Sequence, residues 1–220
     1  MNQKNGKNTL GIDIIFEDLD NPIELFKKWF SKAEESEIND PNAVAVATVN
    51  KHYQPNVRMV LLKGLSNKGF VFYTNFNSKK GNELKENQKA SMCFHWKSLR
   101  RQVRVIGKVE EVSAKEADDY YNSRPYKNRI GAWASSQSEI LEKRETFTEK
   151  IKEFEKKFPD QKRVPRPPHW SGWRLLPKEI EFWLDGEGRI HERLNYKKKK
   201  WKLEKRTALS LKRSVKTKTS

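Results

Sequence analysis

Cysteine and long apolar runs are the two features that this chain most clearly lacks. Cys93 is the only cysteine among 220 residues, so no intramolecular disulfide can form, and we expect a reducing compartment, by default the cytoplasm. No segment approaches the roughly 20 apolar residues of a membrane span. The opening residues MNQKNGKNTLG contain no apolar stretch typical of a secretory leader. We therefore expect a soluble protein with no membrane partner.

Several familiar catalytic and metal-binding motifs are also missing. There is no glycine-rich dinucleotide fingerprint, no phosphate-binding Walker loop, no serine elbow and no paired-carboxylate motif. The chain has four histidines, and neither they nor the lone cysteine have the spacing of a zinc site. The histidines are His52, His95, His169 and His191. We therefore predict no metal site.

Positive charge, in contrast, is abundant. The formal net charge is +17, and residues 196–220 contribute +10 of it through eleven Lys or Arg against Glu204, which leaves +7 for the rest of the chain. Such an excess is compatible with nucleic acid, an acidic membrane surface or phosphorylated small ligands. Nucleic acid is the weaker interpretation, because no aromatic stacking platform or recognition-helix motif is evident.

The apolar pattern predicts one α+β domain built on an antiparallel barrel. We expect a mobile N-terminal arm over residues 1–20, a compact domain over 21–205 and a basic, disordered tail over 206–220. Helical spacing follows the Asn21-Pro22 start and recurs in four later segments. These are about 78–87, the stretch from Ser113 to near Pro125, IGAWAS, and 138–158.

Short β-rich runs separated by turns fill the remainder of the domain. Gly107 lies inside one of them and predicts a bulge or bend, as closing a small barrel requires. A final hairpin is expected around Gly186-Glu187-Gly188, extended by WKLEK. The runs are AVAVATVN, VRMVLLKG, GFVFYTN, ASMCFHW, RQVRVIGKVEEV, WRLLP, EIEFWLD and RIHERLNY.

Arg189, His191 and Arg193 form the strongest local signal for a binding site. Residues at i, i+2 and i+4 of a strand share one face, so two guanidinium groups and an imidazole would form one patch. An anion is the natural partner of such a patch. The alternative is a solvated strand face, paired with Glu192 or Asp185, and periodicity alone does not separate the two.

Two further segments carry candidate phosphate-binding cations. In RMVLLKG, the odd separation of Arg58 and Lys63 predicts opposite faces of a regular strand, although the segment taken alone is better explained as an ordinary buried strand with charged ends. In YTNFNSKKG, Lys79 and Lys80 follow Ser78 at an expected helix start, where backbone N–H groups favour an anion. Lysines at helix starts are also common solvent-exposed residues.

Five ordered motifs together resemble the pyridoxamine 5'-phosphate oxidase family. The motifs are RMVLLK, YTN, RQVRVIG, YYNSRPYKNRIGAWASSQS and IEFWLDGEGRIHER, and the similarity covers roughly residues 20 to 205. The resemblance implies an antiparallel split β-barrel with flanking helices, working as a homodimer with FMN bound at the subunit interface. It also implies oxidation of pyridoxamine and pyridoxine 5'-phosphates to pyridoxal 5'-phosphate by O2, with H2O2 as product and ammonia from the amine.

The resemblance further implies a role for individual residues, with Arg189 and His191 over the pyridine ring as catalytic groups. The implied FMN contacts are Arg58, Met59, Val60, Leu61, Leu62, Lys63, Tyr73, Thr74, Lys79, Lys80, Gln102, Gln137, Ser138, Trp183 and Arg193. The implied substrate contacts are Lys63, Tyr120, Arg124, Asn128, Arg189 and His191.

The chain departs from the family pattern at two of these positions, and other functions stay open. Lys79 stands where many members have Arg, and Asn128 stands where Ser is usual. The alternatives are a split-barrel flavoprotein with another substrate, which the presence of Arg124, Arg189 and His191 argues against, and a basic nucleic-acid-binding protein.

Overall fold

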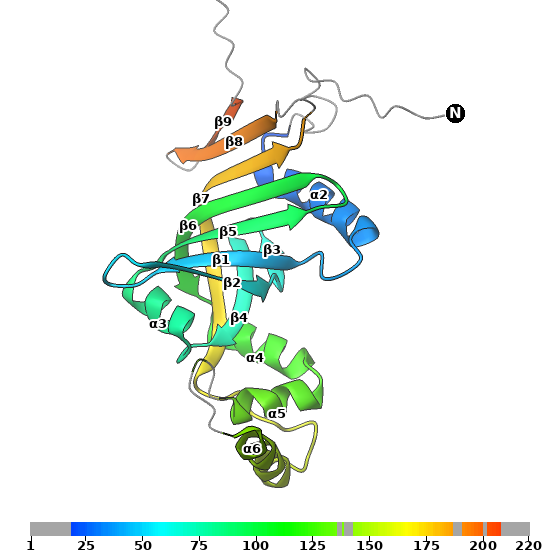
Figure 1. The fold of residues 1–220 in the computed structure, drawn as a ribbon, viewed down its shortest axis with the longest axis vertical. Coiled ribbons are helices and arrows are strands. Elements are labelled where there is room, and N and C mark those ends of the chain that lie inside the picture. Colours follow the sequence, from blue (N-terminus) through cyan, green and yellow to red (C-terminus); the bar gives the residue numbers. More distant parts are fainter. Residues whose placement is uncertain (1–18, 136–137, 139–142, 187–190, 200–201, 208–220) are drawn as a thin grey trace, which may run out of the picture. The chain divides into compact units, whose positions relative to one another are not determined.

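The computed structural model describes residues 19–135, 138, 143–186, 191–199 and 202–207. Figure 1 shows the strands of a sheet with helices inserted between groups of strands along the chain. Described helices are α2 (Pro22–Ser36), α3 (Lys79–Glu86), α4 (Ala114–Ser123), α5 (Tyr126–Ala134) and α6 (Arg144–Lys157). Described strands are β1 (Ala43–Val49), β2 (Pro55–Leu61), β3 (Gly64–Ser66), β4 (Gly69–Asn75), β5 (Lys89–Trp96), β6 (Arg101–Glu111), β7 (Trp170–Leu184), β8 (Glu192–Lys199) and β9 (Lys202–Thr207).

The strands form one sheet in the order β2-β1-β5-β6-β7-β4-β3, and β8 pairs with both β7 and β9. The pairings whose register is described, among them β1 with β2 and β4 with β7, are antiparallel. This confirms the predicted α+β class on an antiparallel sheet. None of the helices in the described part of the chain is long and apolar enough to cross a membrane.

Strand β7 is a single element where the sequence predicted two strands, WRLLP and EIEFWLD. Its first half pairs with β4, from Trp170 to Leu175, and its second half pairs with β8, from Glu179 to Leu184. Pro177 lies between these two ladders. Proline has no N–H to donate, so it is tolerated where one pairing ends and the next begins. Strand β7 therefore continues through Pro177, where the sequence predicted the end of a strand.

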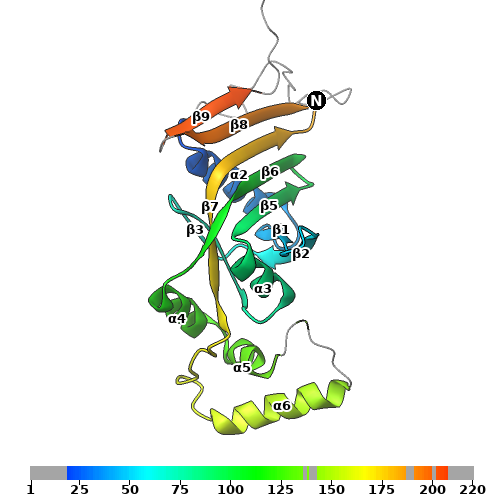
Figure 2. The same cartoon turned by 90° about the vertical axis from the view of Figure 1, so that its left-hand side faces the viewer.

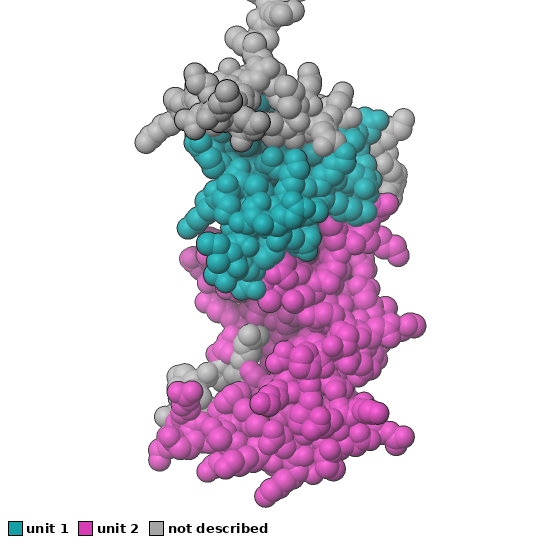
Figure 3. Space-filling model, turned by 90° about the vertical axis from the view of Figure 1, so that its right-hand side faces the viewer, with its two compact units in different colours: residues 1–41, 93–105, 178–220 teal, residues 42–92, 106–177 magenta. Residues whose placement is uncertain are grey.

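Contacts between residues divide the chain into two compact units, coloured separately in Figure 3. Unit 1 comprises 1–41, 93–105 and 178–220. In its core, α2 packs an apolar face on aromatic strand residues: Phe26 lies 4.9 Å from Phe94 and Trp29 lies 5.2 Å from Phe182, measured between ring centroids. Edge-to-face aromatic pairs of this kind add about 0.5–1.5 kcal/mol to the burial itself.

Unit 2 comprises 42–92 and 106–177 and contains helices α3 to α6. A cluster of buried residues, Tyr121, Ile130, Val164 and Trp170, joins α4 and α5 to the chain that follows α6. Helix α6 adds partly buried Phe154 and lies beside α5 (Figure 2). This cluster places α4 and α5 next to the start of β7.

The capping signals in the sequence are confirmed. The side chains of Asn21, Ser78 and Ser113 accept backbone N–H bonds at the starts of α2, α3 and α4. Helix α6 begins at Arg144 rather than near 138, and β8 begins at Glu192 rather than 189, with part of each difference lying outside the described residues. The short strand β3 was not predicted.

Gly107 occupies a position in β6 where no side chain fits. A Cβ atom there would run into the backbone carbonyl of Leu176 in the neighbouring β7. Because backbone atoms of a paired strand cannot move aside cheaply, the close approach requires glycine. The prediction of a special backbone position at Gly107 therefore has a steric basis.

Gly107→Ala should destabilise the protein by at least about 2 kcal/mol, through overpacking against the strand backbone. Gly131 is the matched control, because a Cβ there meets nothing within 4 Å and the residue lies inside α5. Gly131→Ala should therefore raise stability by about 0.5–1 kcal/mol. Urea denaturation monitors both. Equal midpoints for Gly107→Ala and wild type would contradict this account.

Candidate functional site

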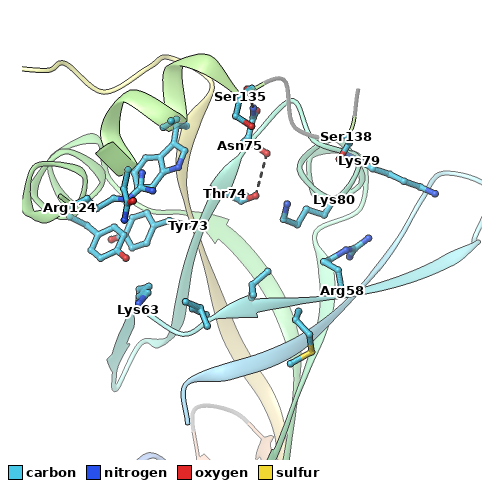
Figure 4. A pocket seen from close by; sticks show the side chains of 18 of the residues that line it. Arg58, Lys63, Tyr73, Thr74, Asn75, Lys79, Lys80, Arg124, Ser135 and Ser138 are labelled. Carbon is cyan, nitrogen blue, oxygen red and sulfur yellow. Dashed lines mark hydrogen bonds between the residues drawn. The ribbon is translucent and has the colours of Figure 1, made fainter. Parts of the chain in front are cut away.

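A cavity of about 900 Å³ opens in unit 2 between β2, β4, α3, α4 and α5 (Figure 4). Six of its lining residues carry positive charge, and none of the described lining residues is acidic. A concentration of cations in a concave site without an acidic lining residue favours an anionic ligand. The cations are Arg58, Lys63, Lys79, Lys80, Arg124 and Lys127.

Five of the six cations fall into two groups on opposite sides of the cavity. Figure 4 shows Arg58, Lys79 and Lys80 together on one side, and Arg124 and Lys63 on the other, with β4 residue Thr74 between them. One ligand with two anionic ends, or two anionic ligands side by side, would match this division.

The first group gathers at the start of α3. Ser78 caps the helix by accepting the N–H of Gly81, and Lys80 Nζ donates to the same hydroxyl at 3.2 Å. Lys80 is buried, and this burial, followed by the nearby Arg58, lowers its pKa from 10.5 to about 8. A buried ammonium beside a guanidinium is stabilised by an anion. The corner of the cavity formed by Arg58, Lys79 and Lys80 at the start of α3 is therefore suited to a phosphate group.

Arg58 lines the cavity from β2, and its guanidinium is hydrogen-bonded to groups on β1 and α3. Its Nη1 donates to the carbonyl oxygen of Val46 at 3.2 Å and to Thr48 Oγ1 at 2.5 Å. Its Nη2 lies 3.3 Å from Glu83 Oε2. The guanidinium is therefore fixed in direction before any ligand arrives.

The second group centres on Arg124, which follows the end of α4. Its guanidinium lies over the ring of Trp170, 4.9 Å from the centroid, and its Nη1 is buried with no hydrogen-bond partner in the described part of the structure. Burial lowers the pKa of Arg124, although Tyr120 and Tyr121 oppose the shift. A buried guanidinium nitrogen without a partner indicates a site for a ligand oxygen.

Three aromatic rings stack beside Arg124. Tyr73 lies 4.0 Å from Tyr120 and 5.2 Å from Trp170 between centroids, with interplanar angles of 17° and 7°. Burial, together with Glu116, raises the pKa of Tyr73 to about 12, so its hydroxyl stays protonated at neutral pH. Because the rings cover one another, they are not an open platform for stacking nucleic-acid bases.

Two arginines anchor the helix that carries Tyr120. Arg174 Nη2 contacts both carboxylate oxygens of Glu116, at 2.7 and 2.6 Å, and Arg166 Nε donates to Asp118 at 2.6 Å. Arg166 Nη1 also donates to the carbonyl oxygen of Trp170 at 2.7 Å. Charge-assisted pairs of this geometry fix α4 against β7 and the segment before it.

Asn75 joins β4 to the end of α5, two elements that line the cavity. It is buried at the end of β4, and its Nδ2 donates to the carbonyl oxygen of Ser135 at 3.3 Å, at the end of α5. Ser138 lies nearby, and its hydroxyl accepts the N–H of Lys79 at 3.4 Å. Ser135 is thereby joined to β4, and Ser138 to the start of α3.

Most of the site residues predicted from the sequence meet in this cavity, although their roles stay predictions. Arg58 and Lys63 both line it, so the expectation that they occupy opposite strand faces is wrong: β2 ends at Leu61, and Lys63 lies beyond the regular strand. The other predicted residues in the lining are Met59, Val60, Leu61, Tyr73, Thr74, Lys79, Lys80, Ser138, Tyr120, Arg124 and Asn128.

The remaining predicted residues do not line the cavity. Leu62 is 5% exposed and buried in the apolar core of unit 2. Gln102, Trp183, His191 and Arg193 belong to unit 1, whereas Gln137 and Arg189 lie outside the described residues. Their proposed contacts with a ligand therefore stay predictions.

Within unit 1, the two described members of the predicted basic patch have acidic partners. His191 Nδ1 lies 3.0 Å from Asp185 Oδ1, and Arg193 Nη1 lies 3.7 Å from Glu181 Oε2. The His191 ring also lies 4.7 Å from that of Trp183. His191 precedes β8, so the regular i, i+2, i+4 strand geometry does not hold for it.

Several residues that line the cavity were not predicted from the sequence. Asn75 and Lys127 lie inside the quoted motifs YTN and YYNSRPYKNRIGAWASSQS, so a fuller reading of those motifs would have included them. Trp170 had no comparable signal, because the pairing of β7 with β4 brings it opposite Asn75. The other missed residues are Asn56, Val57, Gly131, Ala132 and Ser135.

An antiparallel sheet with a cation-lined cavity is typical of a protein that binds an anionic small molecule. The family described as pyridoxamine 5'-phosphate oxidase matches residues 30–158, and the pyridoxine 5'-phosphate oxidase C-terminal dimerisation region matches residues 170–207. The pyridoxine/pyridoxamine 5'-phosphate oxidase of Pelagibacter ubique is 58% identical over 194 residues, which cover 88% of this chain and 93% of that protein. The chain therefore belongs to the pyridoxamine 5'-phosphate oxidase family of enzymes.

Solved structures agree on the fold. PhzG from Burkholderia lata, crystallised with tetrahydrophenazine-1-carboxylic acid, superimposes with a TM-score of 0.81 at 28% identity, covering 87% of this chain and 93% of that one. A pyridoxamine 5'-phosphate oxidase-related, FMN binding protein from Nostoc punctiforme gives a TM-score of 0.68 at 15% identity, covering 84% and 96%. The predicted split-barrel fold is thereby confirmed.

Lys80→Met should stabilise the ligand-free protein at pH 7 by about 1–3 kcal/mol, because methionine removes an ammonium that burial disfavours. Since the pKa of Lys80 falls to about 8 on folding, the folded wild type releases this proton at lower pH than the unfolded chain. Wild-type stability should therefore rise between pH 8 and 10.5, and the advantage of the variant should shrink.

Urea denaturation at several pH values measures this effect, with the exposed Lys79→Met as control, for which a change below about 0.5 kcal/mol is expected. If Lys80→Met is less stable than wild type at pH 7, the buried ammonium does not destabilise the ligand-free protein, and the account is contradicted.

Proposed function

We propose that the chain binds FMN and oxidises pyridoxamine 5'-phosphate and pyridoxine 5'-phosphate to pyridoxal 5'-phosphate. The acceptor is O2, which leaves as H2O2, and the amine substrate also consumes water and releases ammonia. The observation that supports this most directly is the cavity lined by six cations and, among the described residues, no carboxylate. Its two groups of cations match two phosphorylated ligands.

The corner at α3 suits the phosphate of FMN. Lys80 and Arg58 direct positive charge to one place, Lys79 adds a third cation at the helix start, and Ser138 contributes a hydroxyl. The lowered pKa of Lys80 is itself a sign of fit, because a phosphate dianion would restore the charged form. Cations near the flavin also stabilise its reduced, negatively charged form.

The corner at Arg124 suits the phosphate of the vitamer. Arg124 lines the cavity and its guanidinium can donate to a phosphate oxygen, and Lys63 and Asn128 can add further donors. Tyr120 would then lie beside the substrate, on the ring stack that Arg124 also contacts. Fixing the vitamer by its phosphate holds its reactive carbon at a defined place.

When bound, FMN supplies the acceptor for the hydride and transfers the electrons to O2. The protein supplies position and electrostatics: the two phosphate corners hold both rings at a set separation. We propose that Arg189 and His191 act at the pyridine ring, with Asp185 orienting the imidazole through Nδ1. The remaining proposed flavin contacts are Leu62, Gln102, Gln137, Trp183 and Arg193.

The alternatives are less well supported. A split-barrel flavoprotein with another substrate shares the fold, but Arg124, Tyr120 and Asn128 all line the cavity where the vitamer phosphate is proposed. A nucleic-acid-binding protein would present cations on an open surface with uncovered aromatic rings, whereas here the cations line a cavity and the rings are stacked on one another.

We also propose a homodimer in which a second copy covers the cavity, located in the cytoplasm. Strand β2 ends the strand order, and alternate residues along it are apolar and exposed: Val57 at 68%, Met59 at 64% and Leu61 at 38%. An exposed apolar row on an edge strand favours burial by a partner. All three residues also line the cavity, so the partner would close the FMN site.

Arg58→Ala and Arg124→Ala should have different effects if the two corners have the proposed roles. Arg58→Ala should weaken FMN binding at least tenfold, measured by the quenching of flavin fluorescence. Arg124→Ala should keep FMN and raise the KM for pyridoxamine 5'-phosphate at least tenfold, measured by oxygen consumption. Losing one hydrogen bond to a charged group costs about 1.5–3 kcal/mol, which corresponds to factors of this size.

Loss of FMN from Arg124→Ala with unchanged affinity in Arg58→Ala would reverse the assignment of the corners. A wild-type protein that takes up no FMN, or that consumes no oxygen with either vitamer phosphate, would refute the proposed function itself.

Val57→Lys should convert the proposed dimer to a monomer and weaken FMN binding, because an ammonium would be buried in an apolar contact. Light scattering after size-exclusion chromatography gives the mass. Ile38→Lys is the control, since Ile38 is 93% exposed and is not on β2, and it should remain a dimer. An unchanged mass for Val57→Lys would place the dimer contact elsewhere.

A further inference from the structure

Glu83 is a buried carboxylate directly behind the proposed flavin-phosphate corner. It lies on α3, one turn after Lys80, and is 4% exposed. It does not line the cavity and so cannot contact a ligand there. A buried carboxylate is expensive unless its oxygens are fully hydrogen-bonded, so its partners show what it does.

Those partners come from both strands of the β1–β2 pair. Glu83 Oε2 accepts the hydroxyl of Thr48 at 2.5 Å and lies 3.3 Å from Nη2 of Arg58, while Oε1 accepts Nδ2 of Asn56 at 2.6 Å. The strand register places Thr48 opposite Asn56, and Arg58 opposite Val46. One carboxylate thus joins helix α3 to two adjacent strands.

The three groups Glu83, Thr48 and Arg58 form a closed triangle. The Thr48 hydroxyl accepts from Arg58 Nη1 at 2.5 Å and donates to Glu83, which uses its single proton and leaves each bond with a defined direction. Thr48 is fully buried, so water does not compete for these bonds. Rotation of the guanidinium away from the cavity would break contacts with both Glu83 and Thr48.

We infer that Glu83 is a positioning residue, which acts through Arg58 and Thr48 to hold the Arg58 guanidinium toward the phosphate of the cofactor. The inference rests on the proposed binding of FMN. A preorganised arginine loses less conformational freedom when the ligand binds, so Glu83 should increase affinity without touching the ligand. Glu83 also forms an ion pair with Arg58, the residue whose charge, after burial, lowers the pKa of Lys80.

A double-mutant cycle on FMN affinity tests this role. Glu83→Gln keeps the volume of the side chain but removes the charge and replaces one acceptor oxygen by a donor amide. It should weaken FMN binding about tenfold in the wild-type background and less than twofold in the Arg58→Ala background, because Arg58 is the group through which it acts. Titration of the protein freed of flavin, followed by flavin fluorescence, gives each affinity.

Two controls separate positioning from general support of the fold. Glu86→Gln alters an exposed carboxylate on the same helix and should leave FMN affinity unchanged. If Glu83→Gln does not fold, Thr48→Val is the alternative test variant, and Thr48→Ser is its control. Valine removes the hydroxyl that joins Arg58 to Glu83 and should weaken FMN binding about tenfold, whereas serine keeps the hydroxyl and should not.

Each other result counts against the inference. A folded Glu83→Gln protein with wild-type affinity would show that Arg58 needs no such support. An equal loss of affinity with and without Arg58 would show that Glu83 only stabilises the fold. Failure of wild-type protein to bind FMN would refute the proposed function instead, so the two failures are distinct.

Discussion

The repulsion among like charges in one cavity is the constraint on which the rest of this structure depends. Six cationic side chains line the site without a carboxylate among its described lining residues, and one of them, Lys80, is buried enough that its pKa falls to about 8. A folded chain maintains such an arrangement only if other interactions hold it, or if an anion completes it. In unit 2, Glu83 supplies an interaction of the first kind through its contact with Arg58, and the cavity leaves room for an anion.

The fold supplies rigid supports for these charges. Arg58 projects from a strand paired along its length with β1, and α4 is fixed by the contacts of Arg174 with Glu116 and of Arg166 with Asp118. The ring stack of Tyr73, Tyr120 and Trp170 fills the space beside Arg124. Groups held by strands and anchored helices keep a geometry that loops would lose, which is what a reaction between two stacked ring systems requires.

Much of this could be predicted from the sequence, because the information is local. Helix starts at Asn21, Ser78 and Ser113 follow from capping chemistry within three or four residues. The resemblance in five motifs, together with that local reading, also placed Arg58, Lys80 and Arg124 among the candidate ligand contacts, and all three line the cavity.

The rest depends on contacts between distant parts of the chain. Trp170 reaches the site only because β7 pairs with β4, and Glu83 becomes a partner of Arg58 only when α3 packs on β1 and β2. Lys63 was assigned to the wrong face because the end of β2 at Leu61 has no clear sequence signal. Strand β7 runs through Pro177 because two different ladders meet there, which no local pattern shows. Arg189, on which the proposed chemistry at the pyridine ring depends, lies outside the described residues.

The central claim is that the two groups of cations hold a flavin and a phosphorylated vitamer face to face. The absorption spectrum of the purified protein, recorded before and after anaerobic addition of pyridoxamine 5'-phosphate, tests it most directly. The account predicts a flavin spectrum whose visible band is bleached by the substrate and returns when oxygen is admitted. A flavin band that pyridoxamine 5'-phosphate leaves unchanged, or a protein with no flavin band even after FMN is supplied, would contradict it.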